Sequence, residues 1–253
     1  MFTKAIVRKP CQNLIKGITT ANLGIPNYSL ATYQHQKYID ALKECGLTVT
    51  TLEADEDFPD SIFVEDAALL TPQCAIITNP GAIERKGEII EMKNVVQRFY
   101  SNLEMIEEPG TLEAGDVMMI GTHFYIGLSK RTNDAGARQL IKILNKYGMT
   151  GSTISLSNSL HLKSDISYLE NNNLLFAGKS INKNDFKNFN IIQVDEDESY
   201  AANSLWINNK VLVPKGFLKS KKKIERLGYL TIEVDVSEFQ KLDGGLSCLS
   251  LRF

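Results

Sequence analysis

The chain has 253 residues, of which 43% are hydrophobic and 23% are charged, and its formal net charge is −2. This composition is typical of a globular protein that is long enough to bury a full core. The near-neutral charge gives no general attraction to nucleic acid or to a membrane surface, so neither partner is expected. No apolar run approaches the ~20 residues of a membrane span, and the first residues lack the apolar region of a secretory signal.

The four cysteines give no metal-binding or disulfide pattern. Cys11, Cys45, Cys74 and Cys248 form no C-x-x-C pair, and the three histidines lie far from them in sequence. This spacing argues against a zinc site. A few scattered cysteines suit a reducing compartment better than a disulfide framework. We therefore expect a cytoplasmic protein without a metal site.

Predicted strands and helices alternate along the chain. The strands at its start are 4–8 and 47–53, and the helices are 30–46, 87–100, 133–148 and one that ends at 228. Four further segments consist of an apolar run, a polar turn and a second apolar run, which is the signature of a β-hairpin. They cover residues 67–78, 116–127, 166–178 and 204–214.

A small polar cluster precedes each predicted hairpin, and one more comes near the end of the chain. The clusters are VEDAA, EAGD, HLKSD, YAANS and DGGLSC. They recur roughly every 40–50 residues, and a helix is expected after most hairpins. No linker or change in composition separates the repeats, so we predict one domain, 1–253, of five α/β units. A radial arrangement would gather the polar clusters at the centre.

The first cluster, in FPDSIFVEDAA, contains Asp60, Glu65 and Asp66. Glu65 and Asp66 are adjacent on a predicted apolar strand, so their side chains should point to opposite faces and at least one should be buried. A buried carboxylate is costly unless a cation or hydrogen-bond donors face it. Alone, the cluster fits a turn acid with a structural ion pair best. As part of a site, it would receive a cationic substrate.

The next two clusters place carboxylates and an imidazole at the same point of the repeat. Glu113 and Asp116 flank Gly115 in LEAGDVMM, and His161 stands between two leucines in SLHLKSD. An Asp turn into a strand is the commoner use of such an acid, but it could also orient an imidazole or bind a guanidinium. A lone histidine among apolar residues is more often a core residue. Its repeat position is what makes His161 a candidate.

Two arginines and one cysteine complete the candidate set. Arg85, in NPGAIER, and Arg131, in GLSKRTN, are most simply surface residues, yet each offers a planar donor fork that suits a carboxylate. Cys248 follows two glycines, which permit close backbone approach, whereas the other three cysteines are interpreted as inert packing. A thiol, an imidazole, acids and two arginines together suit a substrate with a cationic end and a carboxylate end, such as arginine or a derivative.

Four segments carry a resemblance to a known family: FPDSIFVEDAALLTPQCAIITNPGA, LEAGDVMMIGTHFYIGLSKRTN, LHLKS and KLDGGLSCLSLRF. They resemble dimethylarginine dimethylaminohydrolases, close to the bacterial type, and the likeness runs along essentially the whole chain. It implies an α/β fold, a five-bladed pseudo-symmetric α/β propeller of ββαβ units. It also implies a hydrolase that converts Nω-methylated arginines (asymmetric dimethylarginine and monomethylarginine) to citrulline and dimethylamine or methylamine.

The resemblance also implies roles for individual residues. Cys248 would be the nucleophile, His161 the general acid and base, and Glu113 the carboxylate that partners the histidine. The substrate would contact Asp60, Phe63, Glu65, Asp66, Arg85, Arg131, Ile18 and Leu242. Within that set, Glu65 and Asp66 would hold the guanidinium, Asp60 the α-amino group and the two arginines the carboxylate. The loop 16–24 would be a mobile lid.

The implied reaction needs no metal and no organic cofactor. Thiolate attacks the guanidinium carbon, and the histidine protonates the leaving amine and then activates water. The expected partner is the small-molecule substrate, and a homodimer is the candidate assembly. The resemblance implies the guanidino-group-modifying superfamily, within which the alternatives are an arginine deiminase-like or other guanidine hydrolase and an amidinotransferase. A non-catalytic binding propeller would not need the thiol, imidazole and acids together, and a cysteine peptidase would not need the paired acids and arginines.

Overall fold

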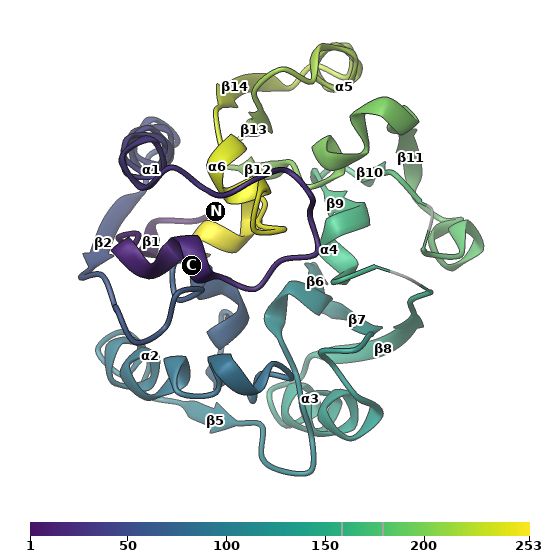
Figure 1. Ribbon diagram of the computed structural model, residues 1–253. Helices are drawn as coiled ribbons and strands as arrows, with labels where there is room; N and C mark the ends of the chain where they lie inside the picture. The colour runs from purple at the N-terminus through teal and green to yellow at the C-terminus, as the bar shows by residue number, and fades with distance from the viewer. Residues whose placement is uncertain (158, 179) are drawn as a thin grey trace.

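The computed structural model describes residues 1–157, 159–178 and 180–253. Within these residues, five three-stranded sheets surround a common centre (Figure 1). The sheets are β15-β1-β2, β3-β4-β5, β6-β7-β8, β9-β10-β11 and β12-β13-β14. Each combines one antiparallel pair with one parallel pair, as in β3-β4 and β4-β5. The predicted five-bladed α/β propeller is therefore confirmed.

The strand bounds follow the predicted repeats closely. They are β1 (Lys4–Arg8), β2 (Thr48–Leu52), β3 (Ala68–Leu70), β4 (Ala75–Ile77), β5 (Leu103–Met105), β6 (Val117–Ile120), β7 (His123–Leu128), β8 (Thr150–Ser155), β9 (Ile166–Tyr168), β10 (Asn173–Phe176), β11 (Asn190–Gln193), β12 (Leu205–Ile207), β13 (Lys210–Pro214), β14 (Leu230–Val234) and β15 (Leu251–Arg252). The four predicted hairpins are thus β3-β4, β6-β7, β9-β10 and β12-β13.

The α-helices are α1 (Tyr28–Glu44), α2 (Glu88–Val96), α3 (Asp134–Lys146), α4 (Leu162–Asp165), α5 (Leu218–Glu225) and α6 (Ser237–Gln240). The crossovers between parallel strands carry α1, α2, α3 and α5, which lie around the outside of the propeller (Figure 1). The side chain of Asn133 caps α3 by accepting a hydrogen bond from the amide of Gly136. None of the helices in the described residues is both long and apolar enough to cross a bilayer.

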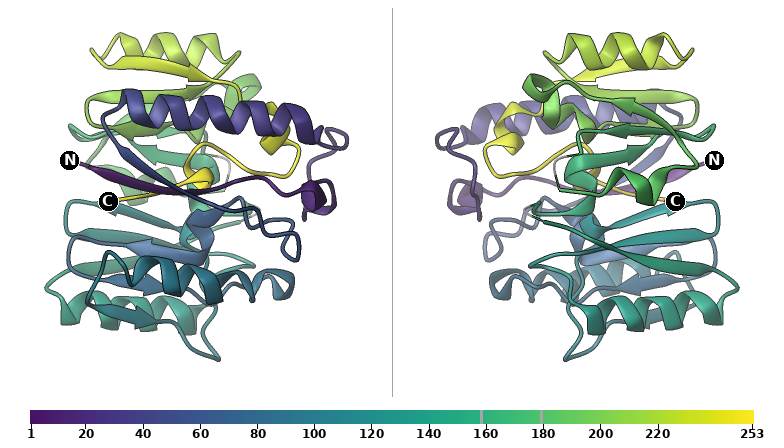
Figure 2. Two further views of the ribbon diagram at one scale, coloured as in Figure 1. Left: turned by 90° about the vertical axis from the view of Figure 1, so that its left-hand side faces the viewer. Right: turned by 90° about the vertical axis from the view of Figure 1, so that its right-hand side faces the viewer.

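Both ends of the chain build the first blade. The C-terminal strand β15 pairs antiparallel with β1, opposing Arg252 to Ala5, and the amide of Thr3 donates to the carbonyl of Phe253 at 2.8 Å. The two termini therefore lie side by side at one end of the molecule, while the segment between β1 and α1 covers the other end (Figure 2). That the whole chain forms one domain stays a prediction.

Inner strands of neighbouring blades contact one another around the centre. Strand β3 contacts β15, and β9 contacts both β6 and β12. The polar clusters stand just before these inner strands, in short helical turns: η2 (Val64–Ala67), η4 (Ala114–Asp116), α4, η6 (Glu196–Ala202) and η7 (Ser247–Leu249). The pseudo-symmetry therefore brings one polar turn from every blade to the same end of the central channel.

Two local predictions were wrong. Glu65 and Asp66 lie in the 3₁₀ turn η2 and not on a strand, so both can face inward, and both are buried. The apolar run at the end of the chain predicts that Cys248 lies on the C-terminal strand, but Cys248 lies in the turn η7, ahead of that strand. In both cases the residues sit in a tight turn, which propensity and alternation do not distinguish from the ends of strands. A helix was expected after most hairpins, and the hairpin β9-β10 is instead followed by a 3₁₀ turn, η5 (Lys183–Phe186).

A buried histidine outside the channel makes the fold sensitive to acid. His35 on α1 is 3% exposed, its ring packs edge-on to Phe239, and its Nε2 has no hydrogen-bond partner among the residues that the structure describes. Burial lowers the pKa of His35 from 6.5 to about 4. The unfolded chain therefore binds a proton at this position between these two values, where the folded chain does not.

We predict that the free energy of unfolding falls as pH drops from 6.5 to 4, because of this linkage. The difference between the pKa of His35 in the unfolded and the folded chain corresponds to roughly 3 kcal/mol of unfolding free energy. His35→Gln should make the decline over that window shallower in urea titrations. An unchanged slope in the variant would contradict the assignment to His35.

Candidate active site

Ten of the eleven predicted site residues line one small cavity, called pocket A here. They are Ile18, Asp60, Phe63, Asp66, Arg85, Glu113, Arg131, His161, Leu242 and Cys248, around a volume of about 30 Å³. The eleventh, Glu65, lines an adjoining cavity of about 50 Å³, called pocket B, to which His161 and Cys248 also contribute. The thiol and the imidazole therefore stand where the two pockets meet.

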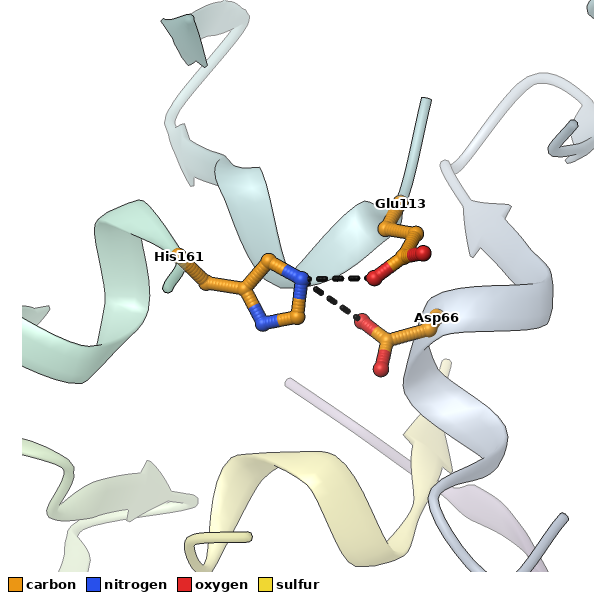
Figure 3. A group of neighbouring side chains, drawn as sticks. All are labelled: Asp66, Glu113 and His161. Atoms are coloured by element: carbon orange, nitrogen blue, oxygen red, sulfur yellow. Dashed lines mark hydrogen bonds and ion pairs between the residues drawn. The ribbon is translucent and has the colours of Figure 1, made fainter. Parts of the chain in front are cut away.

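The imidazole is held by two carboxylates. Nε2 of His161 lies 2.8 Å from Oε2 of Glu113 and 3.9 Å from Oδ1 of Asp66 (Figure 3). The three side chains come from three blades, through α4, the start of η4 and η2. All three are buried. Sequence separation concealed this contact, which only the closure of the propeller creates.

A glycine makes this contact possible. The backbone N–H of Gly115 donates to Oδ1 of Asp66 at 3.0 Å. A Cβ at this position would lie 2.7 Å from that oxygen and 2.7 Å from Nδ1 of His161. A side chain at position 115 would therefore push apart the two groups that face each other here, which explains the AGD sequence of this turn.

The local charges keep the imidazole protonated. Burial lowers the pKa of His161, but the charge of Asp66 and the hydrogen bond that His161 donates to Glu113 outweigh it and raise the pKa to about 9. Burial conversely raises the pKa of Glu113, and the hydrogen bond and charge of His161 overcome it, so this pKa lies below its usual value. His161 is therefore a cationic acid near neutral pH, and Glu113 is its ionised partner.

Arg85 is fixed by the protein on almost every side. Its Nε and Nη2 donate to Glu88 at 2.9 and 2.8 Å, its Nη1 donates to Asp66 at 2.6 Å, and its Nη2 also donates to the carbonyl of Phe63 at 3.0 Å. A guanidinium has five N–H groups, so one N–H of Nη1 remains for a ligand. Arg85 orients Asp66 first, and it can offer a single hydrogen bond to the pocket.

Arg131 is the more available arginine. Its side chain is 18% exposed, and its Nη1 lies 3.6 Å from Oε1 of Glu113, which is a loose ion pair. Asp60 lines the same pocket, where its two carboxylate oxygens accept the backbone N–H of Ile18 at 3.1 Å each. Burial raises the pKa of Asp60, although the charge of Arg85 opposes this. Pocket A thus offers both a cation and an anion to a small polar ligand.

Glu65 is already occupied by protein groups. Its Oε1 lies 2.6 Å from Nζ of Lys163 and 3.1 Å from Nη2 of Arg252, and its Oε2 accepts a 2.8 Å hydrogen bond from the hydroxyl of Ser247. Glu65 therefore forms part of the floor beneath Cys248. Of the two adjacent acids, Asp66 is the one that faces pocket A.

Glycines shape the turn that carries Cys248. A Cβ on Gly244 would lie 2.2 Å from the ring of Phe63, and one on Gly245 would lie 2.5 Å from the amide of Asn203. The close approach expected of these glycines is therefore to Phe63 and Asn203. Burial, followed by the charges of Glu65 and Asp66, raises the pKa of Cys248 to about 12. The free site thus holds a neutral thiol beside a cationic imidazole.

The segment predicted as a lid crosses the open end of the channel (Figure 1). Residues 17–27 carry no regular structure and link η1 (Gln12–Lys16) to α1. The amide of Thr20 donates to Asp243 at 2.5 Å, and the hydroxyl of Thr19 donates to the carbonyl of Lys241 at 2.8 Å. These ties hold the segment over pocket A, and its motion stays a prediction.

Asp66, Glu113 and His161 could also be considered as metal ligands, because one atom from each lies within 4.8 Å of the others. However, Arg85 is 2.6 Å from Asp66 and Arg131 is 3.6 Å from Glu113, so two cations already face the carboxylates. A further cation there would be repelled, and the imidazole would have to lose its proton to bind it. We interpret the group as an acid with its counterions. That the protein needs no cofactor stays a prediction.

Several residues of the site were not singled out from the sequence. Lys163, Asn203, Ser247 and Arg252 surround Glu65 or the turn of Cys248. Lys163 lies within LHLKS and Asn203 within YAANS, so the recurring polar clusters contained the signal. Which side chains of those clusters turn inward could not be decided without the fold.

The family model described as "N,N dimethylarginine dimethylhydrolase, eukaryotic" matches residues 26–249. A dimethylarginine dimethylaminohydrolase of Pseudomonas aeruginosa is 54% identical over all of both chains. The chain belongs to the dimethylarginine dimethylaminohydrolase family. Another member, from Streptomyces coelicolor, is 33% identical and covers 98% of this chain and 96% of its own.

Solved structures of dimethylarginine dimethylaminohydrolases superpose closely on this chain. A cysteine-to-serine mutant from Pseudomonas aeruginosa complexed with citrulline matches with a TM-score of 0.99, and a histidine-to-glycine adduct with S-methyl-L-thiocitrulline matches with 0.98. Both are 54% identical and cover both chains completely. The N-terminal domain of the arginine dihydrolase ArgZ, with a TM-score of 0.90 over 98% of this chain and 97% of its own, is 19% identical and shares the fold.

We predict that Cys248 of the free protein alkylates slowly with iodoacetamide at neutral pH, because its pKa is raised. The alkylation rate should follow the fraction of thiolate. It should therefore still be rising with pH above ~8.5, the pKa of an ordinary thiol. Peptide mapping separates Cys248 from the buried Cys11, Cys45 and Cys74. A rate that levels off below the midpoint of an ordinary thiol would contradict the electrostatic account.

Proposed function

We propose that this protein hydrolyses Nω-methylated arginines to citrulline and a methylated amine through a covalent thiouronium on Cys248. The observation that carries the proposal is the meeting of Cys248 and the His161–Glu113 pair at one pocket that also contains Asp66 and Arg131. The family membership supports it, and so do the citrulline complex and the thiocitrulline adduct of related proteins.

The charges of pocket A define one orientation for the substrate. The guanidinium lies at the carboxylate of Asp66, which lines pocket A together with His161 and Cys248. The α-carboxylate lies at Arg131 and the free N–H of Arg85, and the α-ammonium lies at Asp60. Ile18, Phe63 and Leu242 line the pocket beside the methylene chain. This places the guanidinium carbon beside the thiol.

Substrate binding activates the nucleophile. The thiol of Cys248 is neutral in the free site because it faces carboxylates in a buried place. A guanidinium that docks there brings a positive charge, which stabilises the thiolate and lets the thiol proton leave to solvent. Thiolate then attacks the guanidinium carbon and forms a tetrahedral adduct. The high pKa of the empty site protects the thiol until substrate arrives.

His161 supplies and then recovers one proton. Collapse of the adduct breaks the bond to the methylated nitrogen, and the imidazolium gives its proton to that nitrogen so that a neutral amine departs. The neutral imidazole next takes a proton from water, and the hydroxide adds to the thiouronium carbon. Breakage of the C–S bond, with transfer of the hydroxyl proton to the departing sulfur, releases citrulline and restores the neutral thiol. Glu113 keeps the imidazole oriented and stabilises its charge in both steps.

Three expectations from the sequence remain predictions. They are a cytoplasmic location, a homodimer, and the absence of nucleic-acid and membrane partners. The experiment that tests the function is the turnover of asymmetric dimethylarginine, monomethylarginine and arginine by the purified protein, with citrulline and the released amine both quantified. Arginine as the preferred substrate would favour the arginine deiminase-like alternative.

We predict that Cys248→Ser abolishes citrulline formation and retains substrate binding, because a hydroxyl is too weakly acidic to attack the guanidinium. Calorimetry with asymmetric dimethylarginine would measure the binding. Cys74→Ser is the matched control, since Cys74 is fully buried outside both pockets. Turnover by Cys248→Ser at the wild-type rate would refute the role of the thiol.

The two arginines should differ when removed. Arg131→Ala should mainly raise KM, because a hydrogen bond between charged groups contributes about 1.5–3 kcal/mol. Arg85→Ala should also destabilise the fold, by roughly 3–5 kcal/mol, because Asp66 and Glu88 would remain buried without their cation. Arg138→Ala, on the exposed face of α3, is the control. KM values and urea midpoints would be measured for the three variants. A normal KM for Arg131→Ala would contradict binding of the substrate's carboxylate by Arg131.

A further inference from the structure

We propose that Asn203 is a positioning residue that fixes the acid His161 and the nucleophile Cys248 relative to each other. The inference rests on the proposed function, since it assigns a task within that reaction. Asn203 follows the turn η6, on a blade that supplies neither of the two reacting groups. It is 6% exposed and reaches the backbone on both sides of the site.

One carboxamide ties two separate segments together. Its Nδ2 donates to the carbonyl of Lys163 at 2.8 Å and to the hydroxyl of Ser247 at 3.0 Å. Its Oδ1 accepts the backbone N–H of Ser247 at 2.9 Å. Both amide hydrogens and the amide oxygen are therefore used, so the orientation of the side chain is fully determined.

The two segments are those that carry the reacting groups. Lys163 lies in α4, whose N-cap residue is His161. Ser247 precedes Cys248 in the turn η7. Two buried side chains therefore span α4 and η7. Asn203 joins the backbones of both segments, whereas Glu65 joins the side chains of Lys163 and Ser247.

The surrounding sequence is adapted to this tie. A Cβ on Gly245 would lie 2.5 Å from Cγ and from Oδ1 of Asn203, so only glycine at 245 lets the carboxamide reach Ser247. From the same turn η6, the hydroxyl of Tyr200 donates to the carbonyl of Gly244 at 2.7 Å. Tyr200 and Asn203 therefore hold the loop of Cys248 at two points, and Asn203 also binds the segment of His161 through the carbonyl of Lys163.

The effect of the spacing between His161 and Cys248 on the reaction rate depends on the leaving group of the substrate. An amine leaves only if His161 is placed to protonate it, whereas methanethiolate leaves without an acid. A misplaced His161 therefore slows turnover of asymmetric dimethylarginine more than that of S-methyl-L-thiocitrulline. Loss of folded protein, by contrast, slows both substrates equally.

The test compares these two substrates in Asn203→Ala and Asn203→Asp. The alanine variant removes all three hydrogen bonds. The aspartate variant keeps the acceptor for the Ser247 amide and loses the tie to Lys163, so it tests the bridge with little change in shape. Asn173→Ala is the matched control, because Asn173 is a buried amide of β10 that bonds Tyr229 and Asn190 far from the site in the fold.

We expect kcat on asymmetric dimethylarginine to fall roughly 100-fold in Asn203→Ala, as misplacement by about 1 Å can cost. KM should stay near that of the wild type, and the fall on S-methyl-L-thiocitrulline should be much smaller. Asn203→Asp should show the same preference between the substrates, and Asn173→Ala should show none.

Three results would overturn the inference: a wild-type kcat in Asn203→Ala, an equal loss on both substrates, or a rise in KM with kcat retained. The last would make Asn203 a substrate contact. If the wild type turns over both substrates and the Asn203 variants lose equal activity on each, the inference is refuted and the proposed function stands. A wild type that leaves asymmetric dimethylarginine unchanged refutes the proposed function, and the inference with it.

Discussion

The ion pair between Asp66 and Arg85 is the interaction on which the rest of the site depends. Asp66 is buried and needs a cation, which Arg85 supplies at 2.6 Å while Glu88 balances the second half of the guanidinium. The carboxylate so fixed raises the pKa of His161 against the effect of burial. Burial and the charge of Glu65 raise the pKa of Cys248, and the charge of Asp66 adds to them. The same buried charge therefore prepares the acid and helps to keep the thiol neutral, and a cationic substrate reverses the second effect.

The propeller explains how residues far apart in sequence come to share that charge. In each of the five repeats a short polar turn stands directly before the inner strand. The pairing of β15 with β1 closes the propeller, so the five turns form one ring. The second and third blades supply Asp66 and Glu113, the fourth supplies His161, and the fifth supplies Asn203. Cys248 comes from the segment that closes the ring, so the nucleophile is placed only when the fold is complete.

The repeats and the polar clusters could be predicted from the sequence because period, turn residues and apolar runs are local signals. The candidate residues were likewise found, with the resemblance to the family assigning their roles. The partners of each side chain were not predictable in this way. Glu65 was expected to hold the guanidinium, yet Lys163 and Arg252 occupy its carboxylate; Arg85 was expected as an open clamp, yet Glu88 and Asp66 take most of its donors. The pairings of Glu65 join different blades, and Asp66 meets Arg85 only through the folding of one blade, so local sequence patterns do not reveal these pairings.

The central claim is that a bound guanidinium turns a protected thiol into the nucleophile. Its most direct test is mass spectrometry of the intact protein after acid quench during turnover of asymmetric dimethylarginine, followed by peptide mapping. The account predicts a mass increase that corresponds to the thiouronium formed by the amidine carbon and the rest of the amino acid, located on the peptide that contains Cys248. An unmodified Cys248 during steady turnover, or an adduct on Cys11, Cys45 or Cys74, would contradict it.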